Sequence, residues 1–140
     1  MVKGVIFDMD GTMFDTERLL TVAWDKAAKE MGVVISPELM EACRGKSPEA
    51  IGKLLKAEFG EDFDCDRICL FKNNIYHEMI KENGVPVKNG LKELLEFLKE
   101  QKIPAAVATS TGRASAEMVL KMAGVYEDLT AFMYGDMLKA

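Results

Sequence analysis

A short run of β-forming residues near the start of the chain leads directly into two acidic side chains. Residues 5–7 read Val-Ile-Phe, Asp8 and Asp10 follow, and Gly11 comes next. An uninterrupted apolar run that ends in a turn signal is typical of a buried parallel strand. Ligands of parallel sheets bind beyond the carboxyl ends of the strands. We therefore expect Asp8 and Asp10 to lie at a ligand-binding edge of such a sheet.

The last third of the chain repeats this pattern. Leucines at helical spacing run through residues 91–102, and the apolar segment 103–108 follows and ends at Thr109. A helix is expected over residues 113–123 and a third strand over residues 131–134. Strand, helix, strand, helix and strand at this spacing predict βαβ units and hence a parallel sheet of the α/β class.

The segment between the first strand and this pattern is expected to be almost entirely helical. Ser36 and Ser47 each precede a proline, at a position typical of a helix N-cap. The expected helices are residues 17–31, 37–43, 48–59 and 64–83. We predict that residues 16–84 form an all-helical cap, inserted into an α/β core made of residues 1–15 and 85–140.

The composition is that of an ordinary soluble globular chain. Its 140 residues carry a net charge of −5, and 49% of them are hydrophobic. Mild acidity argues against a nucleic-acid surface, which needs clustered Lys and Arg. The apolar segment at the N-terminus is too short for a signal peptide or a membrane span. Three cysteines without a disulfide framework favour a reduced, cytoplasmic protein.

Two carboxylates in one crevice suit phosphoryl transfer. An aspartate can attack phosphorus and form an aspartyl-phosphate intermediate. A second carboxyl group can protonate the leaving oxygen and later deprotonate the incoming nucleophile. Because enzyme and substrate are both anionic, a cation is needed between them, and Mg²⁺ is the expected cofactor. Asp-x-Asp alone is more often a solvated turn, but its place after a buried strand and before Gly-Thr makes it far more specific.

The segment from Phe7 to Glu17 resembles the first motif of the haloacid dehalogenase superfamily almost residue for residue. The resemblance covers essentially the whole chain and is closest to the subgroup of β-phosphoglucomutases and phosphoglycolate-type phosphatases. It implies a Rossmann-like three-layer parallel sheet, incomplete in this sequence, and a small phosphorylated metabolite as substrate. It also implies that Asp8 is the nucleophile and a magnesium ligand. Asp10 is then the general acid/base, and its backbone carbonyl is a second ligand.

The second strand ends in a Thr-Ser pair of the kind that binds phosphate. A hydroxyl and free amides between a strand end and a helix start form an anion-binding nest. The family has Ser or Thr at this strand end, so the resemblance assigns Thr109 and the amide of Ser110 to the phosphate. Without Asp8, a plain helix cap would explain the same pair equally well.

A loop between two expected helices resembles the substrate-selecting loop of this family. It contains Arg44, Gly45 and Lys46, whose cations and flexible glycine suit a loop that reaches toward an anionic ligand. A solvated turn is the alternative interpretation. Thr16, near the end of the first motif, is assigned to the substrate side as well.

Departures from the family pattern bear on the type of reaction and on whether the sequence contains the whole active site. Leu20 and Pro48 stand where β-phosphoglucomutases typically carry a His and an Arg, which favours hydrolysis over mutase chemistry. The family also has a Lys, usually followed by Pro, that neutralises the phosphate. Lys139 matches it by position but lacks the Pro. The acidic pair that completes the family's magnesium site has no counterpart, so we expect the sequence to be truncated at its C-terminus.

Three functions stay open on the sequence alone. The first is a magnesium-dependent phosphatase, the second a phosphosugar mutase of the same fold, and the third a catalytically incomplete fragment that binds phosphate or a partner. The incomplete sheet is expected to leave Val5 and Phe7 beside an unpaired edge and an apolar patch. Self-association, or binding of a complementing fragment, is expected through that edge.

Overall fold

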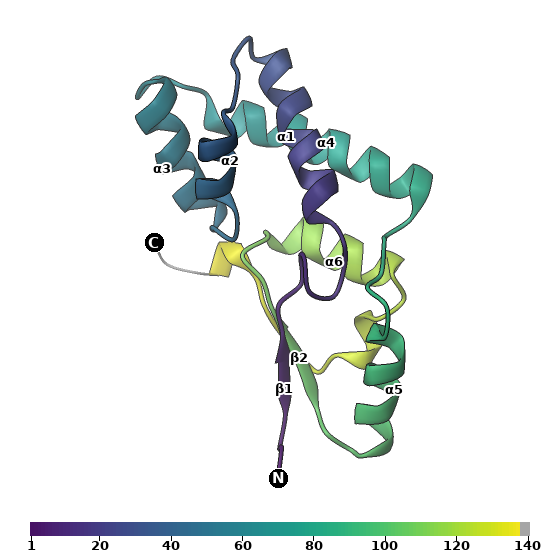
Figure 1. Cartoon of the computed structure of the whole chain (residues 1–140). Helices are drawn as coiled ribbons and strands as arrows, with labels where there is room; N and C mark the ends of the chain where they lie inside the picture. Colours follow the sequence, from purple (N-terminus) through teal and green to yellow (C-terminus); the bar gives the residue numbers. More distant parts are fainter. Residues whose placement is uncertain (138–140) are drawn as a thin grey trace.

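Three short parallel strands form the sheet of the described chain (Figure 1). The computed structural model describes residues 1–137. The strands are β1 (Val5–Phe7), β2 (Ala105–Ala108) and β3 (Ala131–Met133), in the spatial order β1-β2-β3. Phe7 is level with Val107 of β2, and Val107 is level with Phe132 of β3. The parallel sheet confirms the α/β class predicted from the alternating pattern.

Helices make up most of the rest of the described chain. The predicted helices agree with the observed ones to within about two residues at either end. The helices are α1 (Glu17–Glu30), α2 (Pro37–Cys43), α3 (Pro48–Phe59), α4 (Cys65–Asn83), α5 (Leu91–Glu100) and α6 (Arg113–Met122), with short 3₁₀ turns at Tyr126–Asp128 and Gly135–Met137.

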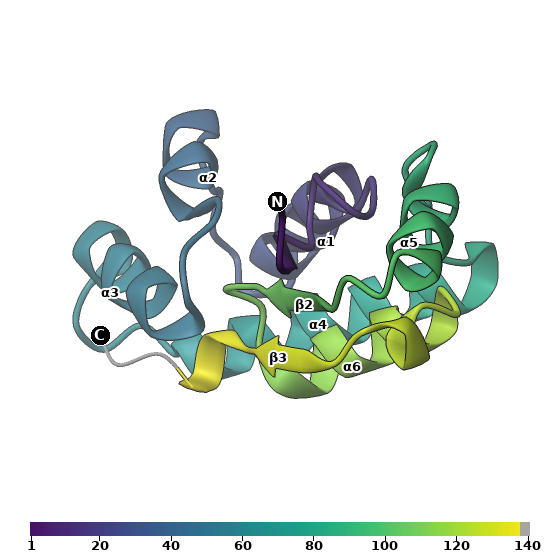
Figure 2. The ribbon, with the colours of Figure 1, turned by 90° about the horizontal axis from the view of Figure 1, so that it is seen from below.

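Helices α5 and α6 cover the same face of the sheet. Figures 1 and 2 show both on one side of the strands, as right-handed crossovers between neighbouring parallel strands require. Leu95 and Leu98 of α5 are buried in one hydrophobic cluster with Leu120 of α6 and Val107 of β2. This cluster is the core that holds the carboxyl ends of β1 and β2 side by side.

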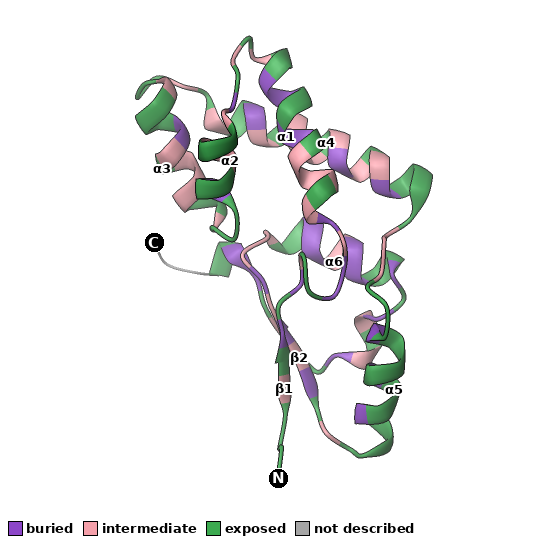
Figure 3. Cartoon of the chain, in the orientation of Figure 1, coloured by how far each residue is buried: buried purple, intermediate pink, exposed green. Residues whose placement is uncertain are grey.

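The opposite face of the sheet is open in residues 1–137, so a third layer is not formed there. Ile6 is 75% exposed and Met133 is 44% exposed, whereas Phe7 is 8% exposed. Within the described residues β1 pairs with β2 alone, which confirms the predicted unpaired edge. The side chain on the open face is Ile6, not Val5 or Phe7, because alternate strand residues point to opposite faces. Figure 3 shows exposed residues along β1.

Helices α1–α4 form a separate group beyond the carboxyl ends of the strands (Figure 1). Helices α1 and α4 pack against each other, and Trp24, Leu55 and Ile68 are buried in a second hydrophobic cluster. The hydroxyls of Ser36 and Ser47 accept hydrogen bonds from the amides three residues later, at 3.1 and 3.2 Å. Both predicted N-caps are therefore confirmed, and they fix where α2 and α3 begin.

No helix in residues 1–137 combines the length and the apolar character that crossing a membrane requires. Cys43, Cys65 and Cys69 are free thiols. Burial raises the pKa of all three thiols, which keeps them protonated and weakly nucleophilic.

Neighbouring residues of β1 offer a test of the open sheet face. We expect Phe7→Ala to lower the free energy of unfolding by about 3–5 kcal/mol, because it removes a buried ring from the core. We expect Ile6→Ala to change it by about 0.5 kcal/mol or less, because that side chain is already in water. Urea denaturation of both variants measures the difference. Equal losses would mean that the Ile6 face is covered in solution.

Candidate functional site

The two acidic residues lie beyond the carboxyl end of β1, as predicted. Asp8 is exposed and Asp10 half-buried, while Met9 between them is fully buried. The amide of Met9 donates to Oδ1 of Asp8 at 2.9 Å. Gly11 has a φ of +83°, which favours glycine, and its amide donates to the carbonyl of Phe14 at 2.8 Å. This turn presents both carboxylates to one pocket.

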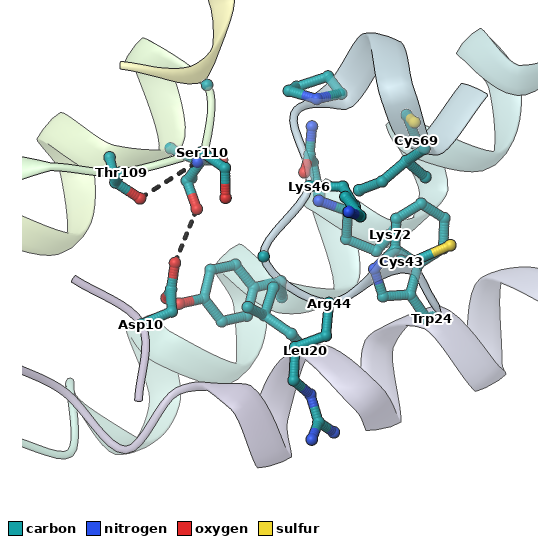
Figure 4. A pocket seen from close by; sticks show the side chains of 18 of the residues that line it. Asp10, Leu20, Trp24, Cys43, Arg44, Lys46, Cys69, Lys72, Thr109 and Ser110 are labelled. Atoms are coloured by element: carbon teal, nitrogen blue, oxygen red, sulfur yellow. Dashed lines mark hydrogen bonds between the residues drawn. The ribbon is translucent and has the colours of Figure 1, made fainter. Parts of the chain in front are cut away.

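Hydroxyl groups from two parts of the chain hold Asp10. Its Oδ1 accepts a hydrogen bond from Thr16, which is fully buried at the start of α1. Its Oδ2 accepts a hydrogen bond of 2.7 Å from Thr111, beyond the end of β2, drawn as a dashed line in Figure 4. Thr16, predicted on the substrate side, thus contacts Asp10. Thr111 is not predicted as a site residue, although it directly follows Thr109 and Ser110.

The predicted phosphate-binding pair lies at the carboxyl end of β2. The hydroxyl oxygen of Thr109 accepts a hydrogen bond of 3.1 Å from the amide of Thr111, which leaves its proton free to be donated. The amide of Gly135 donates to the carbonyl of Thr111 at 2.8 Å. A Cβ at Gly135 would overlap the carbonyl oxygen of Ser110. This close approach requires glycine and fixes the backbone of the loop.

A pocket of about 310 Å³ lies between this end of the sheet and helices α1–α4. Asp8, Asp10 and the loop after β2 form its wall on the sheet side. Figure 4 shows Lys46 and Lys72 across the pocket from Thr109 and Ser110. The helical side includes apolar and cationic side chains, among them Leu20, Trp24, Arg44, Lys46, Lys72 and Tyr76.

The loop predicted to contact substrate borders this pocket, but its arginine is already paired. Nη1 of Arg44 lies 2.9 Å from Glu41, and its Nε lies 3.9 Å from Glu17. Gly45 has a φ of +73°, a backbone conformation that favours glycine in this loop. Lys46 makes no ion pair within residues 1–137. It is therefore the cation of this loop that is available to an anionic ligand.

Helix α4 adds pocket residues that the sequence-based prediction does not include. Cys69, Lys72 and Tyr76 line the same wall, at the spacing of one helix face. The ammonium of Lys72 lies 5.1 Å from the centre of the Trp24 ring. Burial lowers the pKa of Lys72, and Cys69 and Asp10 oppose this shift. The spacing is visible in the sequence, but it is equally typical of a helix that packs on a core.

The pocket offers oxygen ligands that suit Mg²⁺. The carboxylate of Asp8 and the backbone carbonyl of Asp10 are hard oxygen donors, and Mg²⁺ often keeps several waters beside one or two carboxylates. No cluster of three or more His, Cys, Asp or Glu side chains suited to a metal lies within residues 1–137. The donors present thus fit a magnesium ion with few protein ligands. Lys139, the predicted phosphate-binding lysine, lies outside the described residues.

The single histidine of the chain joins the helical group to the core. Nε2 of His77 in α4 lies 2.7 Å from Oγ of Ser115 in α6. Burial lowers the pKa of His77, and the charges of Lys72 and Lys81 lower it further. The sequence gives no sign of this contact, because the two residues are far apart along the chain.

Comparison with known proteins assigns the chain to a family. Residues 5–139 match the sequence profile described as haloacid dehalogenase-like hydrolase. The chain belongs to this family. The resemblance that begins at Phe7 and Asp8 is thereby confirmed, and so is the fold class that it implies.

Named members of the haloacid dehalogenase-like family include phosphatases and a mutase. The chain is 32% identical to the phosphorylated carbohydrates phosphatase of Thermotoga maritima, over 99% of this chain and 63% of that protein. It is 27% identical to fructose-1-phosphate phosphatase YqaB of Escherichia coli, over 97% of this chain and 71% of that protein. The crystal structure of β-phosphoglucomutase from Clostridium difficile is similar, with a TM-score of 0.83 and 25% identity over 100% of this chain and 65% of that one.

The chain is shorter than the haloacid dehalogenase-like relatives that it matches. It spans 63%, 50% and 52% of the length of the first three curated relatives. Similarity to the solved structures nevertheless extends over 98% or more of this chain. What these whole proteins act on is therefore a proposal for this chain.

The burial of His77 in the folded chain predicts a pH-dependent stability. Because the pKa of folded His77 lies below its ordinary value of 6.5, the unfolded chain binds a proton that the folded chain does not. The contribution of uncharged His77 to the free energy of unfolding is fully present above pH 6.5. It is lost as the pH falls below that value. Urea midpoints between about pH 7.5 and 5.5 should fall for the natural chain. His77→Gln should flatten this slope, and an unchanged slope would place its origin elsewhere.

Proposed function

We propose that the chain is a magnesium-dependent phosphatase that hydrolyses a small phosphorylated metabolite through an aspartyl-phosphate intermediate. The observation that carries this proposal is the meeting of Asp8, Asp10, Thr109 and Ser110 on one pocket wall. The names of two relatives, a phosphorylated carbohydrates phosphatase and a fructose-1-phosphate phosphatase, support a phosphorylated carbohydrate as the substrate class.

Asp8 is suited to attack phosphorus. One of its carboxylate oxygens accepts the hydrogen bond from Met9, which leaves the other free as the nucleophile. Its attack forms a bond to phosphorus and expels the substrate oxygen as the P–O bond breaks. The hydroxyl of Thr109 and the amide of Ser110 line the same pocket and would donate to the phosphoryl oxygens.

Asp10 is suited to move the proton in both steps. In the first step its carboxyl group protonates the departing substrate oxygen, and in the second its carboxylate accepts a proton from the attacking water. That water breaks the aspartyl-phosphate bond at phosphorus, releasing inorganic phosphate and regenerating Asp8. The hydrogen bonds from Thr16 and Thr111 orient Asp10 at the pocket wall.

Positive charge in the pocket would offset the repulsion between the carboxylates and the phosphate. The Asp8 carboxylate and the Asp10 carbonyl would hold Mg²⁺, which when bound supplies Lewis-acid stabilisation of the phosphoryl oxygens. Lys46 and Lys72 line the opposite wall and add cationic charge from the chain itself.

Residues 16–84 would act as the cap that selects the substrate and excludes water. Leu20 and Trp24 give the helical wall an apolar surface against which the C–H face of a sugar can pack. Leu20 and Pro48 depart from the mutase pattern, so water is the proposed acceptor of the phosphoryl group. The structural similarity to β-phosphoglucomutase favours a phosphosugar mutase as the second candidate.

The aspartate pair gives the first test of this function. We expect magnesium-dependent hydrolysis of p-nitrophenyl phosphate and of fructose 1-phosphate by the natural chain. Asp8→Asn should abolish turnover, because the amide is a poor nucleophile, and Asp10→Asn should lower kcat by about 10²–10⁴-fold. Asp25→Asn, on the exposed face of α1, is the matched control and should leave kcat unchanged.

Two other outcomes of this assay decide between the alternatives. Isomerisation of a glucose monophosphate that requires added glucose 1,6-bisphosphate and releases no inorganic phosphate would favour the mutase. A folded chain that binds inorganic phosphate but hydrolyses neither ester, with or without Mg²⁺, would contradict the phosphatase assignment and support the catalytically incomplete fragment.

The open face of the sheet is the proposed surface for association, either with a second copy or with a complementing fragment. Ile6 and Met133 are both exposed on it, and β1 has a free edge within residues 1–137. Exposed apolar surface beside unpaired strand groups favours association.

The free thiols support a reducing, cytoplasmic location.

A charge placed on this face tests the association. We expect the natural chain to form a species larger than a monomer in sedimentation experiments at micromolar concentration. Ile6→Lys should shift it toward the monomer, because the ammonium would have to be desolvated at the interface. Val34→Lys replaces an equally exposed apolar residue between α1 and α2 and should have no effect. A monomeric natural chain would refute self-association.

A further inference from the structure

Helix α6 begins without a capping side chain of its own. Its N-cap residue is Gly112, which has no side chain, and its first turn carries no acidic residue. Helices α2, α3 and α4, in contrast, each begin at a side-chain oxygen that accepts a backbone amide proton. The start of α6 matters to the pocket, because the loop that leads into it carries the predicted phosphate-binding pair Thr109 and Ser110.

The cap of α6 comes from Asp136, which lies 23 residues beyond the first residue of the helix. Oδ1 of Asp136 accepts a hydrogen bond of 3.1 Å from the amide of Arg113, where α6 begins. Asp136 belongs to the 3₁₀ turn Gly135–Met137 after β3, and its side chain borders the pocket. A carboxylate in this place satisfies an amide that the helix itself leaves unpaired, and it faces the positive end of the helix dipole.

The same 3₁₀ turn also holds the loop on the other side of Gly112. The amide of Gly135 donates to the carbonyl of Thr111 at 2.8 Å, so the turn is bonded to the backbone both before and after Gly112. The two segments are so close that a Cβ at Gly135 would overlap the carbonyl oxygen of Ser110. Residues 111–113 are therefore held from a distant part of the chain, and not by the helix alone.

Thr111 connects this backbone to the proposed chemistry. Its hydroxyl donates to Oδ2 of Asp10 at 2.7 Å, and its amide donates to the hydroxyl of Thr109 at 3.1 Å. A shift of the Thr111 backbone would therefore move a donor to Asp10 and a hydroxyl of the phosphate-binding pair at the same time. Because catalysis depends on the precise placement of such groups, even a small shift lowers the rate.

We propose that Asp136 is a positioning residue for the loop 109–112, which binds the phosphoryl group and orients Asp10. It acts through the amide of Arg113. The role needs the position of its oxygen and not its charge, because a negative charge beside the pocket repels an anionic ligand. The inference rests on the proposed function for the ligand of this loop, but the ordering of the loop by Asp136 is a property of the folded chain itself.

Hydrogen exchange of the full chain tests this ordering without any activity measurement. Mass spectrometry of a peptide that spans residues 109–116 measures the rate. Asp136→Ala should speed exchange in this peptide about tenfold, because the cap no longer holds its backbone. Asp136→Asn keeps an acceptor in the same place and should exchange like the natural chain. Asp136→Glu keeps the charge but displaces the oxygen by one methylene, so it should resemble Asp136→Ala.

Asp64 provides the matched control. Its Oδ1 accepts a hydrogen bond of 3.0 Å from the amide of Arg67, so it caps α4 as Asp136 caps α6. Because both alanine variants remove one exposed carboxylate cap, each should lower the Tm by about 4 °C. Of the two, Asp136→Ala alone should speed exchange in residues 109–116. Natural exchange there in Asp136→Ala or in Asp136→Glu would overturn the proposal.

Kinetics and phosphate binding test the consequence for the proposed reaction. Asp136→Ala should raise the KM for p-nitrophenyl phosphate and the Kd for inorganic phosphate about fivefold, and it should lower kcat by a similar factor. Asp64→Ala should leave all three values unchanged, and Asp136→Asn should leave kcat unchanged without raising KM or Kd.

The two experiments separate the failure of this inference from the failure of the proposed function. Natural values of KM, Kd and kcat in Asp136→Ala would overturn the positioning role of Asp136. If the natural chain shows no magnesium-dependent turnover, the proposed function fails for this chain. The exchange rates then still decide whether Asp136 orders the loop.

Discussion

The hydrogen bonds to Asp10 tie the helical group of the chain to its sheet. Thr16 opens the helix that buries Trp24 in one hydrophobic cluster, and Thr111 follows the strand that buries Val107 in the other. A carboxylate can accept both bonds at once because it has two oxygens. The same two bonds place the carboxyl group on the wall of the pocket between the clusters. The same hydrogen bonds therefore help to set both the position of the helical group relative to the sheet and the orientation of the proposed general acid.

The sequence predicted those parts of the structure that depend on local chemistry. A short apolar run before Asp8 marks β1, and a serine before a proline marks the start of α2 and of α3. Each of these signals concerns residues within one turn or one strand. The contacts that complete the site were not predicted. Thr111 donates to Asp10 only because β1 and β2 lie side by side, and His77 meets Ser115 only because α4 packs against α6. Contacts of this kind depend on tertiary packing, which the pattern of a single sequence does not contain.

The distribution of charge in the pocket could not be predicted from the sequence alone either. Arg44 fits the pattern of a phosphate-binding cation, yet it is already paired with two glutamates, one on α2 and one on α1. Lys72 lies in a stretch that is indistinguishable from an ordinary helix, yet burial against Trp24 sets its ammonium in the pocket wall. Residue type identified the chemistry that the pocket can support. Which cation is free to bind an anionic ligand depends on the pairing of each side chain. That pairing is set by the tertiary fold.

The strand that carries the nucleophile is also the edge of the described sheet. β1 is held by one ladder, to β2, and its Ile6 faces water, while Phe7 anchors its other face in the core. Asp8 follows Phe7 directly, so whatever pairs with the free edge of β1 would also restrict the backbone of the proposed nucleophile. A partner that binds this edge must stabilise the folded chain by mass action, and a better ordered Asp8 attacks more productively. Association at the open sheet face is thus expected to affect activity in the pocket, because Ile6 on that face is joined to Asp8 in the pocket through Phe7. The two surfaces share no side chain.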